Sequence, residues 1–316
     1  MIEGRSFCRH VVQQSRLDGH LHVGWDNSLP PILEVAPGDE VFVDCIDASG
    51  GVLNRNSVAA DIERLTPAVV NATTGPIAIA GARPGQTLVV EILDFMPGCW
   101  GWTALIPGFG LLADEFPEPR LNISRLRDGS IDFADGLILP LRPFAGTMGL
   151  APARPGRHDV IPPHASGGNM DIRHLVASTT LYLPIQVPDA LLSVGDTHAA
   201  QGDGEVCGTA VEAPMGVVMR FSLSDRGISA PEYSLPPCAK APDPVGYHAT
   251  VGMGSDLREA ARDAVRRMID CLQSRHGLRA ECAYMLCSVA GDLSISEIVN
   301  RPNYLVSMQM PLSIFG

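Results

Sequence analysis

Two stretches of the sequence, PGDEVFVDCI at residues 37–46 and PGQTLVVEIL at residues 84–93, decide the fold class. Each starts with a Pro-Gly pair and continues into a run rich in β-branched and other apolar residues. Proline fixes φ near the value that the first turn position needs and glycine supplies a positive φ, so each stretch predicts a turn followed by a strand. Residues 71–95 as a whole are expected to form a β-meander. Further strand-like runs occur at residues 32–35, 181–187, 216–223 and 304–310.

These runs predict a mainly β protein, with sandwich-like or barrel-like sheets and a few helices. The clearest helix is expected near residues 255–275, where Ser255 can cap the first turn and apolar residues recur at helical spacing. Gly277 follows as a stop signal. A second, shorter helix is expected in residues 279–289, although the end of that segment fits a strand equally well.

The whole chain, residues 1–316, is expected to form one β-rich catalytic unit, with a subdivision near residues 145–150 as the alternative. Residues 1–5, Met-Ile-Glu-Gly-Arg, are typical of a protease recognition tag added for expression, and could also be natural. We leave these five residues out of the reasoning on the fold.

Composition excludes several classes of function. Hydrophobic residues make up 46% and charged residues 18%, which allows a sizeable core. The net charge of −12 argues against a nucleic-acid partner, and no apolar run is long enough for a membrane helix. No secretory segment is recognisable, so a cytoplasmic location is expected. The 8 cysteines are scattered without a CxxC pair, which favours reduced thiols over disulfides or a zinc-cysteine site.

Two loops, at residues 164–171 and 195–205, concentrate side chains that can bind a metal. Asp196 and His198 are two residues apart, and so are Asp203 and Glu205, so the two side chains of each pair would lie on the same side of an extended segment. Carboxylates together with an imidazole suit zinc or another divalent ion. The alternative is structural, because Asp and Gly are also the commonest turn residues.

Other residues have two interpretations. His20 and His22 could be ligands, and a solvated start of a strand is the favoured alternative. Trp102 could wall a small pocket, or belong to the core. A thiol nucleophile of the nitrilase kind at Cys207 or Cys287 is disfavoured, because it needs a glutamate and a lysine nearby and Lys240 is the chain's one lysine.

A set of short motifs, in collinear order over nearly the full length, is similar to the acetamidase/formamidase family. The motifs are TGP at 74–76, GARPG at 81–85, VEILD at 90–94, PGFG at 107–110, PFAGTMG at 143–149, GGNMD at 167–171, residues 195–205, MLCSVAGD at 285–292 and PLSIF at 311–315. The resemblance implies a β-rich amidohydrolase that cleaves small linear amides such as formamide or acetamide. It further implies a divalent metal, with zinc as the expected ion, and a homo-oligomer of two or more copies.

We expect the following roles from this combination. The expected metal ligands are Asp171, Asp196 and His198. Glu205 is expected to shuttle the proton, and Asp196 and Glu205 could exchange roles. Asn169 and Gln201 are expected to bind the amide group or the oxyanion. The alternatives are a metal-stabilised β-rich binding protein without turnover, or a hydrolase of a larger or cyclic amide.

Overall fold

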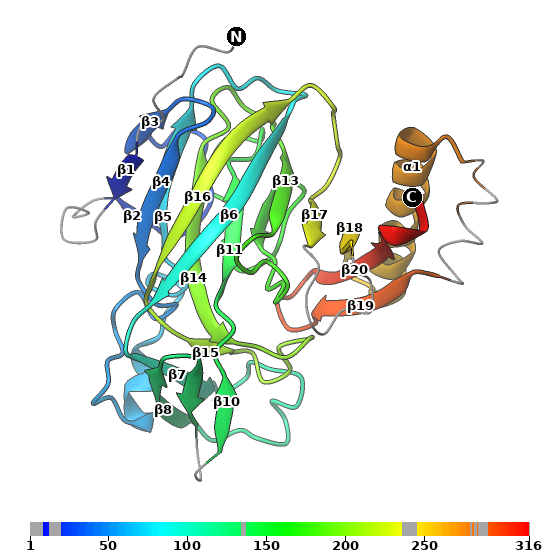
Figure 1. The fold of residues 1–316 in the computed structure, drawn as a ribbon. Helices are drawn as coiled ribbons and strands as arrows, with labels where there is room; N and C mark the ends of the chain where they lie inside the picture. The colour runs from blue at the N-terminus through cyan, green and yellow to red at the C-terminus, as the bar shows by residue number, and fades with distance from the viewer. Residues whose placement is uncertain are drawn as a thin grey trace.

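The computed structural model of the chain describes residues 9–12, 20–133, 137–235, 245–278, 280, 283 and 290–315. Its strands form two large sheets, which confirms the mainly β prediction (Figure 1). Among the helices in these ranges, none combines the length and the apolar character that crossing a membrane requires. Residues 1–5, with their tag-like sequence, lie outside the described residues. The organisation of the whole chain as one unit stays a prediction.

The first sheet has nine strands, which come from the N-terminal, middle and C-terminal parts of the sequence. Its spatial order is β1 (Arg9–Val12), β4 (Glu40–Cys45), β16 (Met215–Ser224), β6 (Thr87–Pro97), β13 (Thr180–Pro184), β17 (Glu232–Leu235), β18 (Tyr247–Gly254), β20 (Tyr304–Pro311) and β19 (Asp292–Glu297). All neighbours are antiparallel except β1 and β4, which are parallel.

The second sheet has eleven strands, and its central strand is β14 (Leu192–Ala200). Along its main path the order is β10 (Ile138–Pro140), β9 (Ser130–Asp132), β8 (Arg120–Arg127), β7 (Trp100–Leu105), β15 (Val211–Glu212), β14, β11 (Phe144–Leu150) and β12 (Gly167–Asn169). Off this path, β5 (Thr73–Ile79) pairs with β14, β2 (Leu21–His22) and β3 (Leu33–Val35).

The main core lies between the two sheets. In β4 of the first sheet, Val41, Val43 and Cys45 are fully buried and alternate with partly exposed residues, as expected for a strand with one face on a core. The Cys45 sulfur lies 3.8 Å from the carbonyl oxygen of Val194 in β14 of the second sheet. Each fully buried side chain of this size stabilises the fold by roughly 1.5–3 kcal/mol, so the core holds the second sheet firmly in place.

Both predicted Pro-Gly turns are present, with φ of 101° at Gly38 and 90° at Gly85, and each leads into a strand, β4 and β6. The predicted β-meander over residues 71–95 is wrong. β5 and β6 belong to different sheets, because the segment between them carries the chain from the second sheet to the first. Apolar alternation indicates that a segment is a strand, but it does not indicate which strand it pairs with.

The predicted helix is confirmed as α1 (Leu257–His276), with Gly277 in the left-handed conformation at its end. Its cap is Asp256 rather than Ser255, because the Asp256 carboxylate accepts the backbone N–H of Glu259. Its buried face, which includes Ala260 and Met268, packs on β18 and β20 at one side of the molecule (Figure 1). Most of the second predicted helix, residues 279–289, lies outside the described residues.

Candidate active site

The centre of the candidate site is the C-terminal half of β14, where the side chains of Asp196 and His198 project to the same side of the strand. The His198 Nε2 atom lies 3.2 Å from Asp196 Oδ1, and both residues are buried. The contact expected from their spacing is therefore present. The ring of Phe144, from the neighbouring strand β11, meets the His198 ring edge to face at 4.9 Å between centroids and limits its orientation.

Glu212 is a third member of this cluster, and sequence reasoning missed it. β15 pairs with β14 so that Glu212 lies opposite His198, and Glu212 Oε2 is 3.1 Å from His198 Nε2. Its other oxygen accepts the backbone N–H of Ala210 at 2.8 Å. The signal that could have revealed it is a lone glutamate inside the apolar stretch Ala210–Met215, because a carboxylate in such a run is seldom buried without a partner.

Asp171 and Glu205 approach His198 from two further segments. The donor atoms of these three residues all lie within 4.8 Å of one another. The Asp171 Oδ2 atom accepts a hydrogen bond from Asn300, whereas its Oδ1 atom is buried and has no hydrogen-bond partner in the described structure. Asp171, Asp196 and Glu205 all have a positive φ, of 48°, 50° and 47° respectively. Strained conformations of this kind are typical of functional sites.

The cluster carries a large excess of negative charge. Four carboxylates surround one imidazole, and His198 is the one cationic partner that the described residues offer them. Burial raises the pKa of Asp171 and of Glu212, each to about 7, and Asp196 adds to both effects. Burial and then Asp171 raise the pKa of Glu205 well above its ordinary value. Carboxylates in this state favour a bound proton or a metal ion.

The pKa values of Asp196 and His198 reflect their mutual contact. Burial acts to raise the pKa of Asp196, but the charge of His198 and the hydrogen bonds with His198, Glu212 and Thr147 together lower that pKa. Burial acts to lower the pKa of His198, but Glu212 and Asp196 raise it well above its ordinary value. The lowered pKa of Asp196 and the raised pKa of His198 favour an ion pair between them.

Space for a ligand between the carboxylates depends on Gly146 in β11. A Cβ atom at this position would lie 2.5 Å from Asp171 Oδ1, 2.7 Å from His198 Cε1 and 2.8 Å from Asp196 Oδ2. Any side chain here would therefore fill the point on which these three groups converge. The lack of a side chain at residue 146 leaves a small polar cradle, and the unpaired Oδ1 atom of Asp171 faces it.

Gln201 holds His198 in one tautomer. The Gln201 Nε2 atom donates to the backbone oxygen of Asp171 at 2.8 Å, so its Oε1 atom faces His198 Nδ1, also at 2.8 Å. An amide oxygen can only accept, so Nδ1 carries the hydrogen and Nε2 faces the carboxylates. Gln201 was expected to bind substrate, but both ends of its side-chain amide form hydrogen bonds within the protein.

Neutral polar residues complete the site. Asn169 Oδ1 accepts from Thr147 Oγ1 at 2.5 Å and from Asn71 at 3.3 Å, and Asn169 Nδ2 donates to the backbone oxygen of Ile161. The Thr147 hydroxyl also lies 3.1 Å from Asp196 Oδ2. These contacts place the Asn169 amide, which was expected to bind substrate, beside the carboxylates.

A cavity of about 210 Å³ opens onto this cluster. Trp102 lines it, in agreement with the pocket interpretation of that residue. Its charged and amide lining is formed by Asn71, Asn169, Asp171, Asp196, Glu205, Glu212 and Asn300. A second cavity of about 450 Å³ lies on the other side of the loop after β14, and Glu205 and Thr209 line both.

Several candidate residues lie elsewhere. His22 bonds the Gly24 carbonyl oxygen and the Ser193 hydroxyl, each at 2.8 Å, so both of its ring nitrogens are engaged away from the carboxylates. Asp203 lies 3.8 Å from Arg173 and 3.9 Å from His174, on the outer side of the loop. Cys207 is half-buried and lines the 450 Å³ cavity but not the 210 Å³ cavity at the carboxylates. Cys287 lies outside the described residues.

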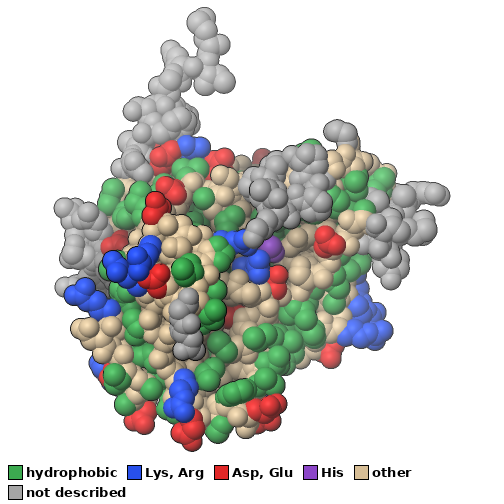
Figure 2. Space-filling model, turned by 60° about the horizontal axis from the view of Figure 1, so that its bottom comes forward, with side chains coloured by type: hydrophobic (Ala, Val, Ile, Leu, Met, Phe, Trp, Pro, Cys, Tyr) green, Lys and Arg blue, Asp and Glu red, His purple; other side chains and the backbone are tan. Residues whose placement is uncertain are grey.

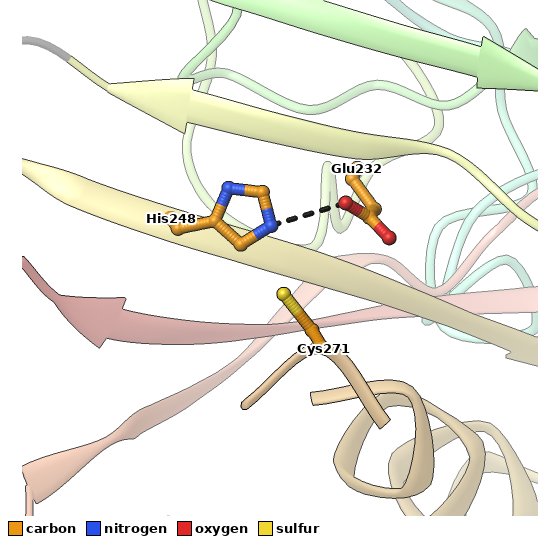
Figure 3. Close-up of side chains that lie close together, drawn as sticks. All are labelled: Glu232, His248 and Cys271. Carbon is orange, nitrogen blue, oxygen red and sulfur yellow. Dashed lines mark hydrogen bonds and ion pairs between the residues drawn. The ribbon is translucent and has the colours of Figure 1, made fainter. Parts of the chain in front are cut away.

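A separate cluster joins α1 to the first sheet. Glu232 of β17, His248 of β18 and Cys271 of α1 lie close together (Figure 3). Arg275 lies 3.3 Å from His248 Nδ1 and can only donate, so His248 Nε2 carries the hydrogen that it shares with Glu232 at 3.1 Å. Arg226 donates two more hydrogen bonds to Glu232. The lone pairs of Glu232 and His248 that a metal would need are thus used within the protein.

The charge state of Glu232 agrees with this structural role. Burial acts to raise its pKa, but hydrogen bonds from His248 and Arg226 outweigh burial and lower the pKa to about 2. Burial lowers the pKa of His248, which is therefore neutral near pH 7. We interpret the cluster as a buried polar network that fixes α1 on β17 and β18.

The chain is similar to known proteins over nearly its whole length. A model of the Acetamidase/Formamidase family matches residues 9–158 and 156–316. A formamidase from Methylophilus methylotrophus is 29% identical, over 94% of this chain and 90% of its own. The structure of an acetamidase from Bacillus halodurans has a TM-score of 0.86 at 30% identity, with 98% of each chain covered. An acetamidase from Yersinia enterocolitica has a TM-score of 0.88 at 28% identity, over 99% of this chain and 94% of its own.

Proposed function

Because this chain belongs to the acetamidase/formamidase family of amide hydrolases, we propose that it hydrolyses small linear primary amides with the help of a divalent metal ion. The products are a carboxylate and ammonia. The relatives are named formamidase and acetamidase, which makes formamide and acetamide the first substrates to test.

The observation that carries the metal is the convergence of four buried carboxylates on one imidazole. An uncompensated buried charge is unfavourable by several kcal/mol, so such a cluster needs protons or a cation. The unpaired Oδ1 atom of Asp171 and the open cradle at Gly146 support a cation, because they leave both a free lone pair and the room for an ion.

The ligands in this proposal are Asp171, Asp196, His198 and the additional residue Glu212. They offer carboxylate oxygens and the Nε2 atom of a histidine whose tautomer Gln201 has already set. Zinc is the proposed ion, since it binds imidazole and carboxylate together. When bound, a divalent ion supplies Lewis acidity and lowers the pKa of a water from about 15.7 to about 7.

Glu205 is the proposed proton carrier. It lines the cavity beside Asp171 and His198, and no hydrogen bond of the described structure holds its carboxylate. In the proposed reaction it accepts the proton of the attacking water and delivers it to the amide nitrogen, so that ammonia can leave. The carbonyl oxygen gains charge at the same time.

Asn169 is the proposed partner of that oxygen. One hydrogen of its Nδ2 group donates to Ile161, and the second remains for the substrate carbonyl. For Gln201 the geometry supports a positioning role instead of direct substrate binding, since both ends of its amide are engaged with His198 and Asp171.

The test combines metal analysis with an ammonia-release assay over formamide, acetamide, propionamide and urea. We expect near-stoichiometric divalent metal, ammonia from the amides, and loss of activity on chelation that added zinc restores. Full activity of metal-free protein would reject the metal-dependent mechanism. Stoichiometric metal without ammonia from any amide would favour the rival, a metal-stabilised binding protein. Light scattering during size-exclusion chromatography tests the predicted homo-oligomer.

A further inference from the structure

The cavity at the carboxylate cluster is larger than the smallest amides require. Its volume is about 210 Å³, whereas an apolar cavity of about 150 Å³ is enough to bind benzene. Formamide has no carbon beyond its carbonyl, and acetamide has only a methyl group. Either substrate would leave much of this space to water.

The lining of the cavity divides into two parts. One part holds the carboxylates and amides already described. The other part is apolar, with Leu65, Val70, Trp102, Ile106, Phe109 and Ile161 as its main side chains. Water beside such a wall is displaced favourably by a hydrocarbon group.

Two polar groups on the apolar side, those of Trp102 and Thr209, are already paired. Trp102 donates its indole N–H to Asp47 at 2.9 Å, so it presents only its ring. The Thr209 hydroxyl bonds both the backbone oxygen and the backbone N–H of Ala104, each at 3.0 Å. A hydroxyl, amino or carboxylate group on the acyl chain would therefore lose its hydration beside Trp102 and Thr209 without gaining a partner from either.

The apolar side of the cavity is also in contact with the loop that carries Glu205. The ring of Phe109 lies directly against Gly208, where a Cβ atom would be 2.5 Å from it. The N–H of Gly208 in turn donates to the backbone oxygen of Glu205 at 2.8 Å. An acyl chain packed on Phe109 would hold this loop in place during the proton transfer, so its binding energy would also act on kcat.

We infer that the preferred substrate is a primary amide with an unsubstituted hydrocarbon acyl group of about three to five carbons, the number that the space beyond the amide and its water accommodates. This inference rests on the proposed amide hydrolysis. It names the acyl group, while the reaction is unchanged: the C–N bond breaks, water supplies the hydroxyl group to the acyl carbon, and ammonia leaves.

The first experiment measures kcat/KM of the metal-loaded protein over formamide, acetamide, propionamide, butyramide, pentanamide and octanamide. Glycinamide and lactamide serve as polar controls of similar size. We expect kcat/KM to rise about fourfold with each added methylene up to butyramide or pentanamide, the factor that corresponds to burial of one CH₂ group, and to fall at octanamide. Both polar amides should be poorer than propionamide.

The second experiment compares Val70→Phe with Val58→Phe, the same substitution at a residue that is 61% exposed and does not line the cavity. The measured quantity is the ratio of kcat/KM for pentanamide to that for acetamide, which does not depend on the folded fraction. We expect the ratio to fall about tenfold or more in Val70→Phe, because the new ring takes the room of the acyl chain. It should stay unchanged in Val58→Phe.

The outcomes distinguish the inference on the acyl group from the proposed amide hydrolysis on which it rests. Ammonia from formamide and acetamide with kcat/KM falling along the series would overturn the inference on the acyl group and leave amide hydrolysis standing. Glycinamide or lactamide matching or exceeding propionamide, or an unchanged ratio in Val70→Phe, would overturn it as well. Absence of ammonia from every amide would reject the proposed function itself.

Discussion

The side-chain oxygen of Gln201 lies 2.8 Å from Nδ1 of His198, and its amide nitrogen donates to the backbone oxygen of Asp171 at the same distance. One side chain thereby fixes the tautomer of a proposed metal ligand and the backbone of another. Hydrogen-bonding partners of this kind typically contribute 10- to 100-fold to metal affinity, roughly.

Replacing Gln201 by Met keeps the length of the side chain and removes both hydrogen bonds. We expect zinc affinity to fall roughly 10- to 100-fold, while excess zinc restores most of kcat. Zinc titration with a competing chelator measures the affinity, and thermal unfolding of the metal-free protein serves as the control. A lowered kcat at saturating zinc, with affinity unchanged, would show that Gln201 acts on the substrate instead.

Glu212→Gln tests the ligand that only the structure revealed. The substitution retains the hydrogen-bonding shape and removes the charge that faces His198 at 3.1 Å. We expect loss of metal at stoichiometric zinc together with loss of activity, since a neutral amide is a weaker ligand than a carboxylate. The metal content of the variant is measured by mass spectrometry. Retention of the metal would show that Glu212 is not a ligand.

Glu205→Gln tests the proton carrier. We expect kcat to fall by about 10²- to 10⁴-fold with the metal retained, which is the usual contribution of general acid–base catalysis. Asp203→Asn is a matched control in the same loop, because Asp203 faces Arg173 and His174, and we expect activity close to wild type. Loss of metal from Glu205→Gln would make Glu205 a ligand. An inactive Asp203→Asn beside an active Glu205→Gln would exchange their roles.

Gly146→Ala adds one methyl group to the cradle. The new Cβ would lie within 2.8 Å of Asp171, His198 and Asp196, so these side chains have to move apart. We expect zinc affinity to fall by at least about 100-fold, beyond the usual effect of a residue outside the ligand set. Gly202→Ala, where a Cβ would meet nothing within 4 Å, should bind zinc normally. Equal zinc affinity in the two variants would show that the metal lies elsewhere.

The network at Glu232 predicts a pH-dependent stability. Its pKa is lowered from the ordinary 4.5 to about 2 in the folded protein, so the ionised carboxylate stabilises the fold above pH 4.5, and this contribution is lost as the pH falls towards 2. We expect Glu232→Gln to lower the free energy of unfolding by about 3 kcal/mol at pH 7, the usual effect of removing one partner of a buried ion pair.

The difference between Glu232→Gln and wild type should then shrink as the pH is lowered from 4.5 to 2, measured by chemical denaturation. Glu259→Gln is the control, since Glu259 pairs with Arg262 on the exposed face of α1 and should contribute less than about 1 kcal/mol. A difference that is constant from pH 7 to pH 2 would contradict the lowered pKa.

Local patterns in the sequence predicted much of the fold and part of the site. The strand at Glu40–Cys45 and the contact of Asp196 with His198 follow from alternation along a single strand. The same alternation fails in the next loop. Glu205 turns inward and Asp203 outward although they share the spacing, because Glu205 has a φ of 47° and the backbone there is not extended.

The positions of Glu212, which the sequence analysis missed, and of Asn300 depend on contacts between segments that are distant in the sequence. Glu212 reaches His198 only through the register of β15 on β14. Asn300 reaches Asp171 across 129 residues of sequence, and no local pattern indicates that contact. Pairing of strands and closure of loops are properties of the whole chain, so a pattern within ten residues cannot predict them.

The bond between Asn300 and Asp171 also determines how the protein could be divided. A cut in the segment around residues 225–231, between β16 and β17, would leave the carboxylates on one fragment and Asn300 on the other. Neither fragment alone would then possess the complete set of groups around Asp171. Ammonia release from two separately expressed fragments would thus report their reassociation, which makes the chain a candidate for a split-enzyme complementation assay.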